Sequence, residues 1–299
     1  MKKNEQTQRA AKYLVETDWL AQNLDDASLR VFDCTVNFVP NPDAQPGKEP
    51  PFMFESGRAN FDAGHIPGAG FIDVMEDISD KSSALPLMMP PAEEFVQVLS
   101  KLGVDNKSRV VLYSTASPMW AARVWWMLQA VGFESAILNG GWDKWTAEVH
   151  PVSTNPCKYF PGFLTVKSVK RIFAEKEDVL SAINDDNACI INALPPEMHN
   201  GTGDVVFGRK GRIAGSINVP MGKLHDPDTG VYLPVGQLRE IFDAVDVDDA
   251  DKIITYCGGG IASANNAFVL SMLGYKNVAV YDGSMFEWGN NEQLPMETG

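Results

Sequence analysis

Two stretches of this 299-residue chain follow the same pattern, and this internal repeat constrains the fold more than any other feature. Residues 113–133 and residues 256–275 each lead from the end of a β-rich apolar run, through a loop and a helix-like segment, to a glycine and an aromatic residue. Residues 139–145 and 282–288 also correspond, with Gly second and Trp last in both. The chain is therefore expected to consist of two divergent copies of one unit.

Strands that alternate with helices indicate α/β domains. Arg109–Tyr113, Ala188–Asn192 and Ile253–Tyr256 are short apolar runs typical of buried strands, and helix-like segments follow them. Such alternation favours a mostly parallel sheet flanked by helices. We expect an N-terminal domain at residues 10–148, a linker at 149–164 that is rich in Pro, and a C-terminal domain at 165–299. Residues 37–57 contain many Pro, Gly and Asn residues and are expected to form a surface loop.

Composition and charge exclude several classes of function. The chain has 44% hydrophobic and 21% charged residues, as soluble globular proteins do. Its formal net charge of −14 argues against binding nucleic acid or an anionic membrane. The N-terminus lacks the apolar core of a signal peptide, and no run of 18 apolar residues occurs. The four cysteines lack metal-ligand spacing and only four His occur, so we expect no metal, no other cofactor and a reducing, cytoplasmic location.

Cys257 is the predicted catalytic residue. It directly follows the predicted strand Ile253–Tyr256, and three glycines separate it from a helix-like stretch. Glycines let backbone N–H groups converge on one point, and a helix N-terminus favours an anion, so a cysteine there should react as a thiolate. The predicted N–H cradle consists of Gly258, Gly259, Gly260, Ile261, Ala262 and Ser263. The alternative is that Cys257 is a small buried residue in a tight turn.

The first copy of the repeat lacks this equipment. Ser114 stands where the second copy has Cys257, and the loop that follows it is one residue longer and has no glycine. Pro118 within that loop has no N–H to donate. We therefore expect the N-terminal domain to be non-catalytic and to complete the cleft from outside.

The motifs resemble those of the tandem-rhodanese sulfurtransferases. The resemblance rests on the six-residue loop Cys257–Ala262, on His65-Ile66-Pro67-Gly68-Ala69, and on the Leu-Gly-Tyr, Tyr-Asp-Gly-Ser and Glu-Trp elements within residues 273–288. It covers most of residues 12–295. It implies two rhodanese-like domains, each with a five-stranded sheet. It also implies that Cys257 takes sulfane sulfur from thiosulfate or 3-mercaptopyruvate as a persulfide and passes it to cyanide or a thiol.

Substrate-binding residues are carried over less completely. Thiosulfate-preferring members of the family have basic residues at loop positions two and three, and mercaptopyruvate-preferring members have Gly and Ser, whereas this chain has Gly258 and Gly259. One donor-binding arginine of the family falls on Met198. Arg209 is the best match for the other and is predicted to bind the donor anion, with Arg212 nearby. The alternative is a solvated basic cluster.

His65 lies, by resemblance, near the interdomain cleft and could assist substrate binding. The alternative is that His65 is a turn residue whose ring is hydrogen-bonded to the backbone. Cys34, Cys157 and Cys189 follow no glycine loop and are expected to be buried or incidental.

Two other classes of function are alternatives to a sulfurtransferase. A cysteine-dependent phosphatase needs Arg six positions after its cysteine to hold phosphate, and here that position is Ser263. A non-catalytic module, acting as a persulfide carrier or a protein-binding scaffold, remains the alternative to an enzyme. The physiological donor and acceptor and the oligomeric state are open at this point.

Overall fold

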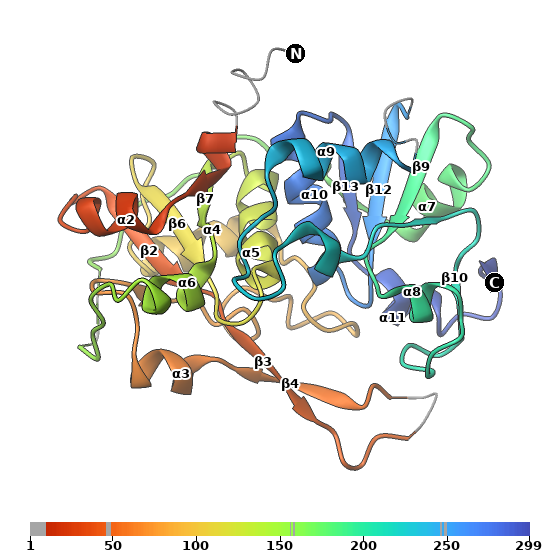
Figure 1. The fold of residues 1–299 in the computed structure, drawn as a ribbon, viewed down its shortest axis with the longest axis horizontal. Coiled ribbons are helices and arrows are strands. Elements are labelled where there is room, and N and C mark those ends of the chain that lie inside the picture. Colours follow the sequence, from red (N-terminus) through yellow and green to blue (C-terminus); the bar gives the residue numbers. More distant parts are fainter. Residues whose placement is uncertain (1–9, 46–48, 156, 158, 246, 248–249) are drawn as a thin grey trace.

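The structure is a computed structural model and describes residues 10–45, 49–155, 157, 159–245, 247 and 250–299. Two five-stranded parallel sheets form its centre (Figure 1). The first has the order β1-β7-β6-β2-β5 and the second β8-β13-β12-β9-β11, so each runs first, fifth, fourth, second and third along its own part of the chain. The strands are β1 (Leu14–Val15), β2 (Leu29–Asp33), β5 (Gly70–Phe71), β6 (Arg109–Tyr113), β7 (Ser135–Leu138), β8 (Phe173–Ala174), β9 (Ala188–Asn192), β11 (Ile217–Asn218), β12 (Lys252–Tyr256) and β13 (Val278–Tyr281). The predicted α/β class with two five-stranded sheets is confirmed.

Helices flank both sheets, and two of them meet between the sheets (Figure 1). Helices α5 (Met119–Ala130) and α10 (Ile261–Leu273) are buried on nearly every side, which fits their mostly apolar sequences. Trp125 and Phe268 pack edge to face between them, with ring centroids 4.9 Å apart. The other helices are α2 (Thr17–Asn23), α3 (Arg58–Ala63), α4 (Ala92–Lys101), α6 (Gly141–Ala147), α7 (Lys176–Ala182), α8 (Pro196–His199), α9 (Val235–Asp243), α11 (Ser284–Trp288) and the 3₁₀ turn η1 (Met221–Leu224).

Corresponding residues of the two domains cross the interface in the same way. The Oδ1 atom of Asn139, after β7, accepts the N–H of Tyr232 at 3.0 Å. The Oδ2 atom of Asp282, after β13, accepts the N–H of Met89 at 2.8 Å. Met89 and Tyr232 each stand three residues before a helix, α4 and α9 respectively. Each domain therefore binds its neighbour through the loop at the carboxyl end of its last strand.

Only one of these two contacts is reinforced by charge. The guanidinium of Arg123 on α5 holds the Asp282 carboxylate with both terminal nitrogens, at 2.5 and 3.1 Å. It also donates to the Leu87 carbonyl at 2.7 Å, and its side chain is fully buried. The fifth residue of α10, which corresponds to Arg123, is the neutral Asn265. The buried ion pair thus stands on one side of the interface, behind the loop that contains Cys257.

The expectation of a surface loop at residues 37–57 is wrong for residues 37–40 and 52–56, which form strands. Strands β3 (Val36–Pro40) and β4 (Phe52–Ser56) form an antiparallel hairpin that extends from the first domain toward the second (Figure 1). Phe38 is paired with Phe54, and Pro40 with Phe52, so three aromatic rings share one face of the hairpin. The alternation of apolar residues in both strands was the overlooked signal. Residues 46–48, between the strands, lie outside the described residues.

Segments outside the two central sheets make specific contacts with other parts of the chain. Tyr159, in the predicted linker, donates its hydroxyl to the Gly68 carbonyl at 2.5 Å, while Pro156 and Lys158 of that linker lie outside the described residues. Strands β10 (Arg212–Ile213) and β14 (Met296–Glu297) pair antiparallel near the C-terminus.

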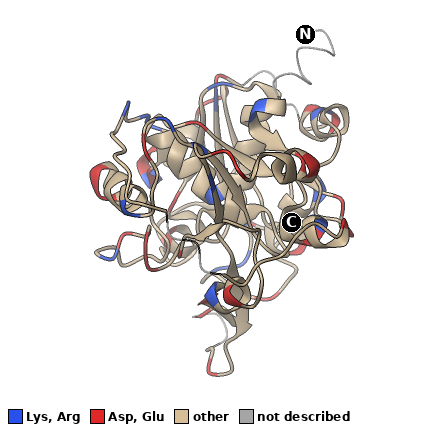
Figure 2. Cartoon of the chain, turned by 90° about the vertical axis from the view of Figure 1, so that its left-hand side faces the viewer, with Lys and Arg blue, Asp and Glu red and all other residues tan. Residues whose placement is uncertain are grey.

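Charged residues gather on outer helices and loops (Figure 2). Among the described residues, no helix has the length and apolarity needed to cross a bilayer, and no cluster of His, Cys, Asp and Glu is arranged to hold a metal ion.

The buried ion pair yields a stability prediction. Arg123→Met should lower the free energy of unfolding by about 3–5 kcal/mol, because it leaves the Asp282 carboxylate buried without its partner. Arg58→Met breaks an exposed pair with Asp62 and serves as the control, with an expected loss below about 1 kcal/mol. Urea denaturation measures both. Equal losses in the two variants would contradict the structural importance of the buried pair.

Candidate functional site

Cys257 lies at the carboxyl end of β12, and its side chain is buried. The chain turns from the strand into α10 through Gly258, Gly259 and Gly260. Gly260 has φ +79°, a left-handed conformation, and a Cβ there would lie 2.5 Å from Oδ1 of Asp282. Only glycine fits this position. The Arg123–Asp282 ion pair therefore packs directly behind the turn.

Ser284 holds the loop in place through hydrogen bonds. It was not among the residues predicted from the sequence. Its hydroxyl oxygen accepts the N–H groups of Cys257 and Gly260, both at 3.1 Å, and its proton goes to the Tyr281 carbonyl at 2.7 Å. The N–H of Gly260, which was assigned to the cradle, is consequently used by Ser284. A difference between the two copies of the repeat pointed to this residue, because the first copy has Gly141 where the Tyr-Asp-Gly-Ser motif of the second has Ser284.

The remaining loop amides are free to receive an anion. In the part of the chain that the structure describes, the backbone N–H groups of Gly258, Gly259, Ile261, Ala262 and Ser263 donate no hydrogen bond. The Ser263 hydroxyl lies 3.5 Å from the Cys257 sulfur and donates toward it. A small hydroxyl thus occupies the position at which a phosphatase would place its arginine. The arrangement suits a single anionic sulfur better than a phosphate group.

Two phenylalanines explain why loop positions two and three have no side chain. A Cβ on Gly258 would lie 2.3 Å from Cζ of Phe207, and a Cβ on Gly259 would lie 2.7 Å from Cδ2 of Phe286. The two rings also pack edge to face, with centroids 5.1 Å apart. Aromatic carbon therefore fills the space that a side chain at either position would need.

A cavity of about 170 Å³ lies over Cys257. The β3–β4 hairpin contributes three of its aromatic side chains, and the segment after β9 contributes Met198. Met119, at the start of α5, comes from the loop of the first copy, as expected for a domain that completes the cleft. Every lining residue is apolar, a glycine or Cys257 itself: Phe38, Phe52, Phe54, Met119, Leu194, Pro195, Met198, Phe207, Cys257, Gly258, Gly259, Ile261, Ala262 and Phe286.

The structure does not bring the predicted arginines into this cavity. Arg209 turns its guanidinium toward the loop after α11 and donates to the backbone carbonyls of Trp288, Gly289, Asn291 and Leu294 at 2.5–3.2 Å. Arg212 donates to the Gly299 carbonyl at 2.6 Å and pairs with Glu297. These contacts hold the C-terminal segment against the second domain and favour a structural role for both residues.

His65 is also absent from the cavity lining. It is fully buried in the first domain, where its ring stacks on Phe61 with centroids 4.0 Å apart. Its Nδ1 and Nε2 atoms lie 2.8 and 3.0 Å from the carbonyl oxygens of Phe61 and Asn155. Both ring nitrogens are thus engaged by the backbone, which favours the reading of His65 as a turn residue that anchors the segment after α6.

The other three cysteines are free thiols that do not lie in a glycine loop. Burial raises the pKa of the Cys34 thiol well above its usual range and raises that of Cys189 to about 11. The pKa of Cys157 is also raised by burial. Thiols of this kind are mostly protonated near neutral pH and are poor nucleophiles. Cys257 is the cysteine whose surroundings include free backbone donors.

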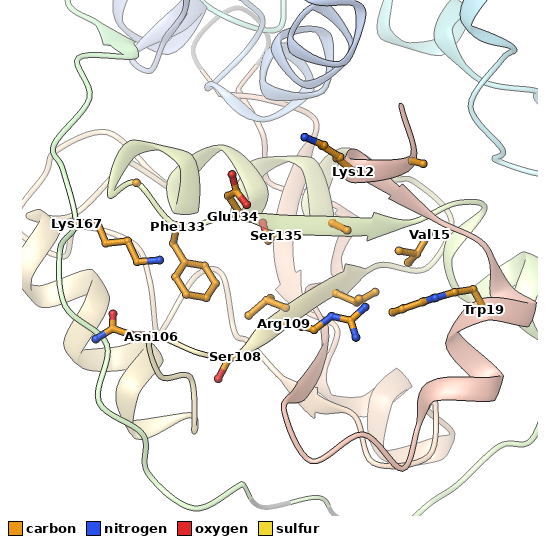
Figure 3. Close-up of a pocket in the computed structure, with 15 residues that line it drawn as sticks. Lys12, Val15, Trp19, Asn106, Ser108, Arg109, Phe133, Glu134, Ser135 and Lys167 are labelled. Atoms are coloured by element: carbon orange, nitrogen blue, oxygen red, sulfur yellow. The ribbon is translucent and has the colours of Figure 1, made fainter. Parts of the chain in front are cut away.

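A second cleft, of about 490 Å³, lies in the first domain (Figure 3). Its lining includes Lys12, Arg109 and Lys167, but Arg109 pairs with Asp26 at 3.1 Å and Lys167 lies over the Phe133 ring. The cleft is formed at the amino ends of β6 and β7, whereas ligands of open α/β sheets bind at the carboxyl ends. It contains no thiol, and we assign no chemistry to it.

Comparisons with known proteins agree with this geometry. The model of the rhodanese-like domain matches the chain twice, at residues 16–148 and 175–291. The 3-mercaptopyruvate sulfurtransferase of Escherichia coli K12 is 32% identical over 288 residues, which cover 95% of this chain and 98% of the relative. The crystal structure of SseA from Escherichia coli superposes with a TM-score of 0.77 at 31% identity, over 91% of this chain and 98% of that one.

Two further relatives differ in their names. The thiosulfate sulfurtransferase of Cricetulus griseus is 30% identical over 95% of this chain and 94% of its own length. The sulfur carrier protein TtuD of Thermus thermophilus is 30% identical over 96% of both chains. The similarity in each case spans both sheets.

The contacts of Arg209 predict the outcome of its removal. Arg209→Ala should lower the free energy of unfolding by about 2 kcal/mol, because carbonyl groups at the turn after α11 lose their donor. The KM for a sulfur donor should stay within about twofold, since the side chain faces away from the cavity. Lys210→Ala, an exposed neighbour, is the control for stability. A large rise in KM without a loss of stability would restore Arg209 to the substrate site.

Proposed function

This chain belongs to the rhodanese family, and we propose that it is a sulfurtransferase in which Cys257 accepts and passes on a sulfane sulfur. The free N–H groups around the Cys257 thiol carry this proposal, because they can stabilise both the thiolate and the persulfide that it forms. Relatives over nearly the whole length, named for 3-mercaptopyruvate and for thiosulfate, support the activity.

The reaction has two halves. The Cys257 thiolate attacks the outer sulfur of the donor, the bond between that sulfur and the rest of the donor breaks, and its electron pair leaves with the donor. With thiosulfate the products are sulfite and the Cys257 persulfide. With 3-mercaptopyruvate the leaving carbon takes up the thiol proton and becomes pyruvate. An acceptor, cyanide or a thiolate, then attacks the outer sulfur of the persulfide and releases the Cys257 thiolate.

The loop residues have distinct roles in this scheme. The amides of Gly258, Gly259, Ile261, Ala262 and Ser263 form the cradle, and the start of α10 adds a favourable dipole. The Ser263 hydroxyl donates to the sulfur of Cys257. Ser284 and Gly260 act indirectly, because they fix the turn that contains Cys257. Neither half of this scheme requires a cofactor or a metal.

A second candidate function is a sulfur carrier that loads at Cys257 and delivers to a partner protein rather than to a small acceptor. Similarity to a relative named as a sulfur carrier protein favours this reading. It uses the same persulfide. The two candidates differ only in the acceptor, so turnover with small thiols separates them. The four free cysteines fit a reducing location, which we propose is the cytoplasm.

Substitution of the nucleophile tests the proposal. Cys257→Ser should abolish thiocyanate formation from cyanide with either thiosulfate or 3-mercaptopyruvate, and should not gain the mass of a sulfur atom on incubation with the donor. Cys189→Ser, at a partly buried thiol outside the site, is the matched control and should keep full activity. A gain of one sulfur by the wild type without turnover would favour the carrier. Unchanged sulfur uptake by Cys257→Ser would contradict the assignment.

A further inference from the structure

The cavity over Cys257 contains no positively charged side chain that could bind an anion. Its lining contains apolar side chains, glycines and Cys257, but no lysine, arginine or histidine. Within the described residues, Arg209 and Arg212 are engaged by backbone carbonyls elsewhere, and Met198 occupies the position where the family resemblance places an arginine. A sulfonate or carboxylate placed in such a cavity would lose its hydration and gain no partner, which is costly. The net charge of −14 adds to that cost.

The aromatic lining has a defined source and shape. Phe38, Phe52 and Phe54 form a mutually packed cluster on the inner face of the β3–β4 hairpin, with centroids 5.0–5.7 Å apart. Trp120 of α5 supports the cluster from behind, at 5.8 Å from Phe38 and 5.9 Å from Phe54. Phe207 and Phe286 form the opposite wall, beside the glycines of the loop. The walls come from two different domains.

The size of the cavity fits one ring. Apolar cavities of about 150 Å³ take up benzene, and this one is about 170 Å³. Phe38 is 49% exposed at its rim, so the cavity is accessible from solvent beside the hairpin. The free amides belong to the loop that follows Cys257, so they can receive charge at the reacting sulfur. The site therefore separates an anion-binding end, at the reacting sulfur, from an apolar end.

Building on the proposed sulfurtransferase function, we propose that the preferred donor is an organic sulfane-sulfur compound with an apolar group of about one aromatic ring, and with its charge confined to the reacting end. The aromatic cavity binds the ring, and the loop amides receive the sulfur. Thiosulfate and 3-mercaptopyruvate place an anionic group in the apolar end and are poorer donors. Phe38, Phe54 and Phe207 are specificity-determining residues.

Aryl and alkyl thiosulfonates provide a matched pair of probes. In both, the Cys257 thiolate attacks the outer sulfur, the sulfur–sulfur bond breaks, and the sulfinate leaves with the electron pair. Benzenethiosulfonate and methanethiosulfonate have the same charge and reacting group and differ in the apolar part. The rate of each with a free small thiol corrects for intrinsic reactivity. After that correction, kcat/KM should be about tenfold or more higher for the benzene compound.

Variants of the hairpin locate the origin of that preference. Phe38→Ala should reduce the benzene-to-methane ratio about threefold or more, because it removes part of the aromatic wall. Phe38→Leu, which keeps an apolar side chain, should retain more of the ratio and guards against loss of the hairpin. Met53→Ala, on the outward face of the same hairpin and 47% exposed, is the control and should leave the ratio unchanged.

The outcomes separate the two levels of the proposal. A corrected ratio near one, or a ratio that Phe38→Ala does not change, overturns the apolar-donor inference while sulfur transfer through Cys257 stands. A kcat/KM for thiosulfate above that for benzenethiosulfonate also overturns it. Absence of persulfide and of turnover with every donor overturns the proposed function itself.

Discussion

The buried ion pair between Arg123 and Asp282 couples the two domains to the loop that contains Cys257. Arg123 comes from a helix of the first domain, and Asp282 follows the last strand of the second. Gly260 approaches the carboxylate so closely that no side chain fits there. The ion pair thus joins α5 of the first domain to the turn that contains Cys257. The loop that contains Cys257 therefore borders the interface between the two domains.

Apolar packing then determines what the site can receive. Phe207 and Phe286 press against the glycines of the loop, and the aromatic face of the β3–β4 hairpin lies opposite. The same rings that require glycine at positions 258 and 259 also remove the space for a charged side chain. Chemistry at the sulfur and selectivity at the cavity are therefore separate properties: backbone amides serve the first, and side-chain carbon serves the second.

Much of the fold and the place of Cys257 between a strand and a helix could be predicted from the sequence, because both depend on local patterns. Strand β12, the glycine turn and Gly274 at the end of α10 follow from residues adjacent in the chain. Arg123, Ser284 and the hairpin were missed for different reasons. The partner of Arg123 lies 159 residues away. Ser284 acts through hydrogen bonds to a distant loop, and the hairpin strands are short and flanked by proline. Arg209 was assigned by position in the family, but its side chain direction depends on the C-terminal segment.

In the proposed complex, the ring of an apolar donor occupies the cavity while its sulfur faces residue 257. A crystal structure of the Cys257→Ser variant with benzenethiosulfonate tests it most directly, because the variant should bind the donor without reacting. We predict the phenyl ring between Phe54 and Phe207, and the outer sulfur within reach of the Ser263 hydroxyl and the loop amides. A ligand bound through its sulfonyl oxygens to Arg209 or Arg212, with the aromatic cavity empty, would contradict the account.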